Sequence, residues 1–241
     1  MAEQTELVTS GPAQAFAGLL GVPLPDLQAG ASLPLMWHWL YLLESPPQAD
    51  LGPDGHPAAS GIPSPPSAGR RRMFAGGRVE CRGALTVGQP ATRTSCVRSR
   101  LDKPGRSGML TFVTAAHQIR QADRVVVAEE QDIVYRDAAG RGPPAAQPSG
   151  ELIPVTAGES RLTRAADPVL LFRFSALTYN AHRIHYDRGY AQDVEGYPGL
   201  VVHGPLQVLM MAETARALAR PEQDFVRQRF AYRLVAPLFD G

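Results

Sequence analysis

Three of the six histidines in this chain of 241 residues, His182, His185 and His203, lie close together in the sequence. A histidine gives up or accepts a proton near neutral pH, which is what general acid–base catalysis needs. A single histidine is more often a surface group or a hydrogen-bonded core group, but this clustering favours a catalytic site. Polar residues of the same stretch, SALTYNAHRIHYDRGYA at 175–191, could support it: Tyr179, Asn180, Arg183 and Asp187.

A second feature is the segment GYPGLVVHGPL at 196–206, in which Gly204 precedes Pro205. Proline is favoured at the first position of a helix, so a helix is predicted over 204–219. The N–H of a glycine at a helix start has no partner within the helix and lies at the positive end of the helix dipole. Aimed at a thioester carbonyl, it would stabilise the charge of an enolate. Taken alone, Gly204 is better explained by close packing of the helix start against a strand.

Together the two segments suit the addition or elimination of water beside a thioester carbonyl. They also resemble the motif of the MaoC-like (R)-specific enoyl-CoA hydratases. The resemblance puts the family's catalytic histidine on His185, its acidic residue on Asp187 and its oxyanion glycine on Gly204. The family's catalytic aspartate falls on Asn180, which cannot transfer a proton. We interpret Asn180 as orienting the water, His185 as taking its proton and Asp187 as positioning the ring or the loop, with loss of catalysis as the alternative.

The phrases NAHRIHYD, LPLMWHWLYLL, LGPDGHP, RRMFAGG and EEQDIVYR resemble more specifically the double-hotdog branch of these enzymes. That branch contains mesaconyl-C4-CoA, itaconyl-CoA and 3-methylfumaryl-CoA hydratases and mitochondrial 3-hydroxyacyl-thioester dehydratases. The resemblance covers nearly the whole chain and implies an α+β fold of two tandem hotdog units, each a long helix wrapped by an antiparallel sheet. Residues 1–150 would form a non-catalytic unit that shapes the acyl pocket, and residues 151–241 the catalytic unit.

The reaction implied by the resemblance is reversible addition of water across the C2=C3 bond of an enoyl-CoA, with no metal and no other cofactor. Arginine-rich loops and the branch favour a short, branched dicarboxylyl-CoA, as in itaconate degradation. A 3-hydroxyacyl-thioester dehydratase of fatty-acid synthesis is the second choice. A non-catalytic acyl-CoA-binding protein, which Asn180 would suit, and a thioesterase are further alternatives.

Composition limits the partners and the location. Lys and Arg number 24 against 23 Asp and Glu, a net charge of +1, which gives no support to nucleic-acid or membrane-surface binding. No apolar run approaches the roughly 20 residues that span a bilayer, and no secretory signal is evident. Cys81 and Cys96 are expected to be buried, reduced thiols. We therefore expect a soluble, cytoplasmic protein. Hotdog sheets commonly pair edge to edge, so the resemblance implies that one chain with two units could form a complete pair, and we expect it to dimerise further into a homodimer.

The remaining pattern predicts the elements that hold these residues. Val- and Thr-rich stretches separated by turn compositions indicate an antiparallel meander in the first half. The apolar run 34–43 indicates a buried helix, and 168–177 and 225–235 indicate strands. Only one strand follows the helix at 204–219, so we expect an incomplete second sheet with an edge strand. The sequence would then be truncated, or its missing strands would be disordered or replaced by a partner chain. The meander strands are 75–87, 91–101, 109–120 and 124–136.

Two Pro/Gly-rich stretches are predicted to be irregular: 45–69, a loop packed near a site, and 137–160, an interdomain linker. Several residues are weaker candidates. Arg183 could meet a phosphate or carboxylate, and an ion pair explains it equally well. LGPDGHP is a turn by composition, and His56 within it is given no role. The others are Arg70 to Arg72 as CoA-phosphate ligands or solvated charges, Trp37 and Trp39 as core, and Glu129, Glu130 and Asp132 as exposed strand positions.

Overall fold

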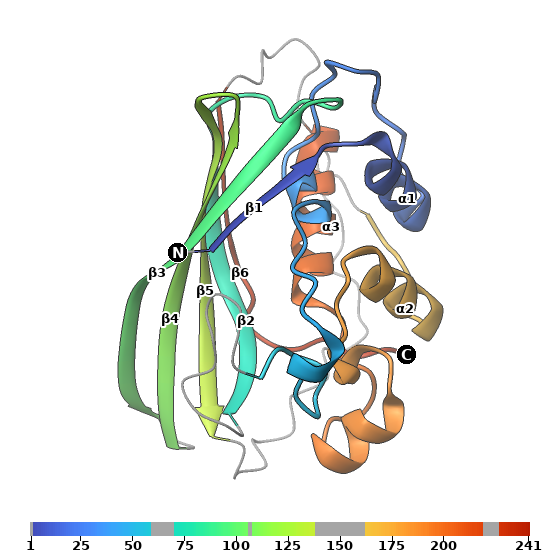
Figure 1. Cartoon of the computed structure of the whole chain (residues 1–241). Coiled ribbons are helices and arrows are strands. Elements are labelled where there is room, and N and C mark those ends of the chain that lie inside the picture. Colours follow the sequence, from blue (N-terminus) through green and yellow to red (C-terminus); the bar gives the residue numbers. More distant parts are fainter. Residues whose placement is uncertain (1, 59–69, 106–107, 138–161, 219–226) are drawn as a thin grey trace.

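The computed structural model describes residues 2–58, 70–105, 108–137, 162–218 and 227–241. In these residues one antiparallel sheet of six strands packs against a layer of helices, which confirms the α+β class (Figure 1). The strands are β1 (Ala2–Leu7), β2 (Arg70–Cys81), β3 (Pro90–Gly105), β4 (Gly108–Gln121), β5 (Arg124–Asp137) and β6 (Gln228–Arg233).

The sheet has the order β1-β3-β4-β5-β2-β6. The meander prediction is confirmed for β3, β4 and β5, which are consecutive neighbours, but it is wrong for β2, which pairs with β5 and not with β3. The reason lies in the connection after Cys81. Backbone hydrogen bonds join Leu33 to Leu85 and Val87 to Ala31, so the segment after β2 runs beside residues 31–33. Strand β3 then begins beyond β5 and β4 in the strand order, not next to β2.

Strand β6 confirms the strand expected near 225–235 and its position at an edge. It pairs with β2, from Gly76 opposite Arg233 to Cys81 opposite Gln228, and it ends the strand order. Within the described residues, β6 thus extends the sheet of the first half of the chain and does not start a separate one. The predicted boundary near residue 150 and the linker 137–160 lie almost entirely outside the described residues.

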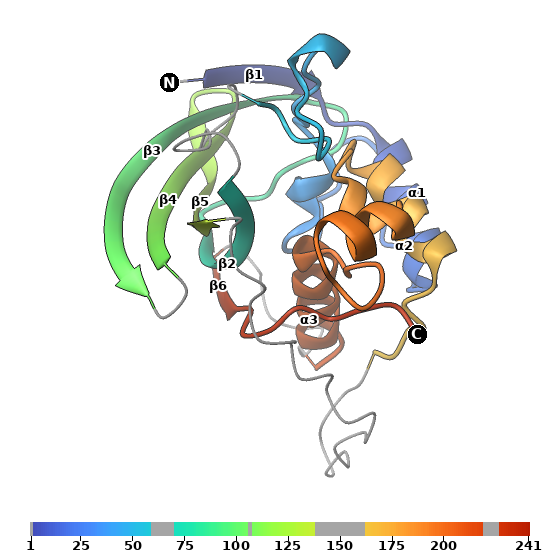
Figure 2. The same cartoon turned by 90° about the horizontal axis from the view of Figure 1, so that it is seen from below.

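Three helices form the second layer: α1 (Ser10–Leu20), α2 (Pro168–Leu177) and α3 (Gly204–Leu218). Helix α3 lies along the inner face of the sheet, with α1 and α2 on its far side (Figures 1 and 2). Its buried face consists of Leu206, Val208, Leu209 and Ala212, the spacing of an amphipathic helix. This confirms the predicted helix and places its N-terminus, Gly204, against the sheet.

The prediction of a strand over 168–177 is wrong, because these residues form α2. Asp167 Oδ1 accepts a hydrogen bond from the N–H of Leu170 at 2.8 Å, and Pro168 follows at the first helical position. An aspartate cap followed by proline is a helix-start signal. A short apolar run does not distinguish a strand from a helix by periodicity alone, so this cap was the informative feature.

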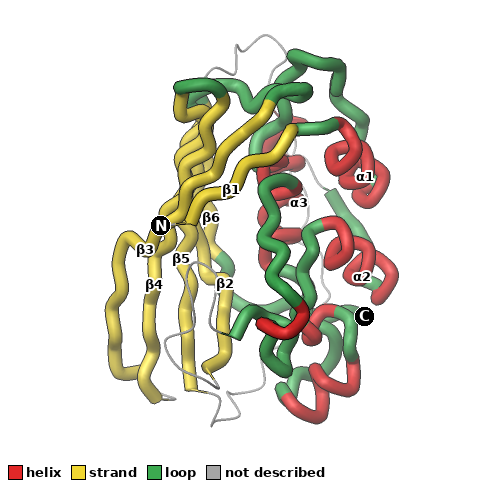
Figure 3. The backbone as a smooth tube through the Cα atoms, viewed as in Figure 1, coloured by secondary structure: helices red, strands yellow, loops and turns green. Residues whose placement is uncertain are grey.

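The buried helix predicted over 34–43 is also wrong in extent. Only Trp37–Leu40 is helical, as a single tight turn. Met36 and Leu42 have φ of 70° and 56°, the left-handed region, which stops a helix on both sides. The other short helical turns are Gln48–Asp50, Arg183–His185 and Tyr190–Val194, all on the helix side of the sheet (Figure 3).

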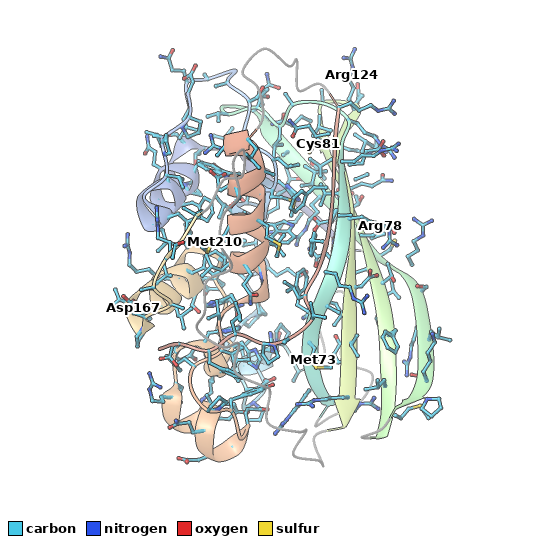
Figure 4. The ribbon with its side chains drawn as sticks, turned by 180° about the vertical axis from the view of Figure 1, so that it is seen from behind. Met73, Arg78, Cys81, Arg124, Asp167 and Met210 are labelled. Atoms are coloured by element: carbon cyan, nitrogen blue, oxygen red, sulfur yellow. The ribbon has the colours of Figure 1, made fainter. Side chains whose placement is uncertain are left out.

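The two faces of the sheet differ. Arg78 projects from the outer face, away from α3 (Figure 4), and pairs there with Glu130 and Asp132. These two acidic residues lie on the outer face, where the side chain of Asp132 is 41% exposed as predicted but that of Glu130 only 13%. The prediction is wrong for Glu129, which is buried. Successive side chains of a strand point to opposite faces, so Glu129 must point inward when Glu130 points outward.

Two further sequence expectations concern the cysteines and membrane spans. Both cysteines are free thiols, but Cys96 is exposed and so is not the buried group expected. Cys96 follows the inward-pointing Ser95 on β3 and therefore faces outward. Among the described residues, no helix is long and apolar enough to cross a membrane.

Candidate active site

The predicted catalytic segment begins where α2 ends. The N–H of Asn180 donates to the carbonyl of Ser175 at 2.8 Å, and Asn180 Oδ1 accepts from the N–H of His182 at 3.0 Å. An asparagine that bonds the backbone two residues on forms a tight turn of its own. This turn leads into the short helical turn Arg183–His185, which delivers the side chain of His185 to the interior.

His185 is held in one tautomer. Its Nδ1 lies 2.7 Å from the carbonyl oxygen of Val201, which can only accept, so Nδ1 carries the proton and Nε2 keeps a free lone pair. Burial lowers the pKa of His185 to about 4. The neutral imidazole therefore predominates at neutral pH, and Nε2 is the ring nitrogen that could accept a proton.

The three clustered histidines come together as predicted. The rings of His185 and His203 stack with centroids 3.7 Å apart, and the ring of His182 stands edge-on to His185 at 5.3 Å. His203 is fully buried, and its Nε2 is hydrogen-bonded to Ser175 Oγ at 2.8 Å. Burial, reinforced by His185, lowers the pKa of His203 to about 2. Burial also lowers the pKa of His182 well below the ordinary histidine value.

Asp187 and Arg183 order the loop that follows. Arg183 donates two hydrogen bonds to Asp187 Oδ2, and Asp187 Oδ1 accepts from the N–H of Tyr190 at 3.0 Å. The guanidinium of Arg183 lies 4.1 Å from the ring centroid of Tyr190. The ion-pair explanation of Arg183 is therefore the one observed. Tyr179 does not join the site: its φ of 50° follows the end of α2, and its side chain points to solvent with 63% exposed.

The turn LGPDGHP lies in the loop 45–69 that was predicted to pack near a site, and it packs directly on this segment. No role was predicted for His56. The N–H of Arg183 donates to the carbonyl of Asp54 at 2.9 Å. The ring of His56 lies 4.0 Å from that of His182, between centroids. Asp54, His56 and His182 each bring a ligand atom within 4.8 Å of the others, so this is the group in the described residues that could hold a metal ion. The one signal in the sequence was a histidine beside an aspartate in a rigid turn.

A cavity of about 220 Å³ lies between the inner face of the sheet and the helices. Asn180 and Pro205 form part of its wall, so the catalytic loop and the start of α3 meet there. Trp39 lines the cavity as well, which corrects its expected role as core alone. The sheet contributes polar groups: Arg72, Arg93, His117, Glu129 and Gln131.

Glu129 anchors the polar wall. It accepts hydrogen bonds from His38 Nε2 at 3.1 Å, from Trp39 Nε1 at 2.8 Å and from Gln131 Nε2 at 2.8 Å. Burial acts to raise the pKa of Glu129, but the hydrogen bond from His38 and the nearby charges outweigh it and the net shift is downward. The buried charge is thus satisfied by its neighbours, as a buried carboxylate requires.

Gly204 is constrained by packing. A Cβ at this position would lie 2.8 Å from Leu234 Cδ1 and 3.1 Å from Phe74 Cδ1. The close-packing explanation is therefore sufficient for the choice of glycine. Its N–H still lies at the start of a 15-residue helix beside the cavity wall, so a role toward an oxyanion stays a prediction.

Comparison with known proteins gives the family. The family model for hydroxyacyl-thioester dehydratase type 2 matches residues 36–240. A mesaconyl-C(4)-CoA hydratase of Chloroflexus aurantiacus is 50% identical over 227 residues, covering 94% of this chain and 78% of that protein. A mitochondrial hydroxyacyl-thioester dehydratase type 2 of Schizosaccharomyces pombe is 26% identical over 225 residues, covering 84% of this chain and 73% of that protein.

Solved structures give the same fold. A MaoC-like dehydratase from Phytophthora capsici superposes with a TM-score of 0.66 at 17% identity, covering 100% of this chain and 82% of that one. HtdX of Mycobacterium tuberculosis superposes with a TM-score of 0.62 at 16% identity, covering 99% and 84%. The chain therefore belongs to the hydroxyacyl-thioester dehydratase type 2 family, hydro-lyases with the MaoC-like hotdog fold.

Proposed function

We propose that this protein reversibly adds water across the C2=C3 bond of the CoA thioester of a short, branched dicarboxylic acid, of the itaconyl, mesaconyl or 3-methylfumaryl type. The half-identical mesaconyl-C(4)-CoA hydratase supports a hydration reaction. The choice of a dicarboxylic acyl group is carried by one observation, the environment of Arg72.

Arg72 lines the cavity, and its side chain has no hydrogen bond or ion pair to any other residue that the structure describes. Its charge lowers the pKa of His56, His117 and His182, in each case after burial, so it lies among the site histidines. A half-buried guanidinium without a partner is unfavourable, and its planar fork matches a carboxylate. The second carboxylate of a dicarboxylic acyl group would supply that partner.

Two other groups add hydrogen-bond donors to the same wall. Arg93 lies in the cavity wall, where its Nη2 is bonded to Gln4 Oε1 at 3.3 Å and forms an ion pair with Glu44 at 3.5 Å. His117 Nδ1 is bonded to Ser95 Oγ at 2.8 Å, whereas its buried Nε2 has no hydrogen-bond partner among the described residues. A long fatty chain would cover these polar groups without satisfying them, and a cavity of about 220 Å³ suits a short acyl group.

The proposed chemistry gives His185, Asn180 and the start of α3 one role each. Nε2 of His185 takes a proton from water as the oxygen of that water bonds to C3. The C2=C3 electron pair moves toward the thioester carbonyl, where the N–H at the start of α3 meets the developing charge. A proton added to C2 then completes the hydration. Asn180, on the cavity wall, would hold the water.

Hydration is tested with a panel of enoyl-CoA thioesters, following loss of the absorbance of the conjugated thioester. Loss of that absorbance means hydration, release of free thiol means thioesterase activity, and neither means binding alone. We expect dicarboxylyl thioesters to be hydrated faster than crotonyl-CoA, which has no second carboxylate.

Arg72→Met should lower kcat/KM for dicarboxylyl thioesters about 10- to 100-fold, the equivalent of one charge-assisted hydrogen bond. The same variant should leave crotonyl-CoA almost unaffected. Arg78→Met, on the outer face of the sheet, is the matched control. An equal loss on both substrates would show that Arg72 is structural and would remove the argument for a dicarboxylic substrate.

Asn180→Ala should lower kcat on the order of 10²-fold with little change in thioester affinity, because misplacing the attacking water slows chemistry more than binding. The variant also removes the acceptor of the His182 N–H bond. Asn180→Asp keeps that acceptor and should fold normally with activity retained or altered. Normal hydration by Asn180→Ala would show that the side chain only shapes the turn.

The cytoplasmic location and the homodimer stay predictions from the sequence. Cell fractionation and sedimentation measure them directly.

A further inference from the structure

The proposed hydration moves two protons, one away from water and one onto C2. His185 provides for the first. Asn180 stands where the resemblance to the wider group of (R)-specific enoyl-CoA hydratases puts a carboxylate, and an amide cannot transfer a proton, so the second proton-transfer group must lie elsewhere. His203 is poorly suited, because it is fully buried and its Nε2 is bonded to Ser175. The turn at 52–56 brings a different group to the site.

This turn is internally rigid. The N–H of Gly52 donates to the carbonyl of His56 at 2.7 Å, and the N–H of His56 donates to Asp54 Oδ1 at 3.0 Å. Asp54 Oδ2 lies 3.4 Å from His56 Nδ1. Asp54 thus sets both the backbone and the ring of His56, and its carboxylate, which can only accept, favours the tautomer with the proton on Nδ1.

The turn is also pressed against the catalytic loop. Besides the bond from the Arg183 N–H to Asp54, Arg183 Nη1 donates to the carbonyl of Pro53 at 3.1 Å. Gly55 has φ of 87°, and a Cβ there would lie 1.9 Å from the carbonyl oxygen of Ala181. Only glycine allows this approach. Two segments far apart in the sequence therefore dock so closely that the His56 ring reaches His182, next to Asn180 and His185.

We propose that Asp54 and His56 form a carboxylate–imidazole pair that serves as the second proton-transfer group of the site, in place of the carboxylate that Asn180 lacks. The proposal rests on the proposed hydration. Among the described histidines of the cluster, His56 has the most exposed side chain, with 24% exposed. Burial lowers the pKa of His56, and the hydrogen bond to Asp54 acts against that shift. The groups that face it are Asp54 in its own turn, Arg72 on β2, and His182 and His185 on the catalytic loop.

Two imidazoles account for both proton transfers of the hydration, one at water and one at C2. Water loses a proton to His185 Nε2 and forms the C3–O bond, and the displaced electron pair makes an enolate. Asp54 opposes the effect of burial and of Arg72 on the His56 imidazolium. The protonated His56 gives a proton from Nε2 to C2. His56 regains a proton from solvent and His185 returns its own to solvent, so the net reaction is addition of one water molecule.

The experiment compares full-length variants on the best thioester of the panel, provided that the wild type hydrates it. His56→Ala should lower kcat on the order of 10²- to 10³-fold with nearly unchanged KM, and added imidazole should restore part of the rate. Asp54→Asn keeps an oxygen acceptor for the His56 N–H and should lower kcat less, while shifting the pH profile of kcat. The matched control is Asp26→Asn, because Asp26 Oδ1 accepts from the N–H of Gln28 at 3.0 Å in an equivalent turn away from the histidines.

Rescue by imidazole separates proton transfer from a structural role, since a merely misplaced loop does not respond to an added base. If His56→Ala folds and retains its rate and pH profile, or loses activity that imidazole does not restore, the pair is not the second proton-transfer group. If the wild type binds zinc through Asp54 and His56 and loses activity on chelation, the site is a metal centre and the proposal is wrong. A wild type that hydrates nothing contradicts the proposed function itself.

Discussion

Replacing His185 by alanine is expected to lower kcat by a factor on the order of 10² to 10⁴, the usual contribution of a positioned acid–base group. The reason is the geometry of its ring. Nδ1 is committed to the carbonyl of Val201 at 2.7 Å, so Nε2 is the free base that can take a proton from water. Initial-rate assays with the preferred enoyl-CoA measure the decrease in kcat.

His185→Asn is the matched variant, because its amide can still donate to the carbonyl of Val201 while it cannot accept a proton as a base. It should fold with nearly wild-type stability, bind a saturated acyl-CoA normally and remain as inactive as His185→Ala. Turnover near that of the wild type in either well-folded variant would remove His185 from the mechanism.

The free energy of unfolding should fall by about 2–4 kcal/mol between pH 7 and pH 5, because two buried histidines stay neutral in the folded protein. Burial lowers the pKa of His185 to about 4 and that of His203 to about 2. Below the ordinary histidine pKa near 6.5 the unfolded chain binds protons that the folded chain does not. Stability is therefore full above about pH 6.5 and is lost as the pH falls toward these lowered values.

The range from pH 7 to pH 5 isolates this effect, since carboxylates with lowered pKa, such as Glu129, reduce stability only at lower pH. Burial lowers the pKa of His117 and His182 as well, which acts in the same direction. Urea unfolding at several pH values gives the slope. His203→Gln removes one titrating group and should make the slope shallower; a flat profile in the wild type would mean that these rings are solvated.

The sequence alone was sufficient for features that depend on local chemistry. Alternation and turn residues predicted β3, β4 and β5, and the Gly204–Pro205 pair predicted the start of α3, because these signals act within a few residues. The catalytic segment was found for the same reason. His182, His185 and Asn180 lie in one short stretch whose residue types limit its chemistry.

Only the tertiary structure decided which distant residues meet. The apolar run at 168–177 became α2 and not a strand, because α2 packs on the core through Leu171 and Phe174 and begins at an Asp167 cap. Glu129 was expected at the surface but is buried, because a shift of one residue along a strand changes the face to which the side chain points.

The pairing of His56 with His182 was beyond sequence reasoning as well. It depends on the docking of a turn at 52–56 against residue 181, which the positive φ of Gly55 allows. Sequence patterns report the preferences of neighbouring residues, whereas contacts between segments far apart are set by how the whole chain packs. For that reason the sequence motif was enough to propose His185 as the base, and it was not enough to find the residues that pack around it.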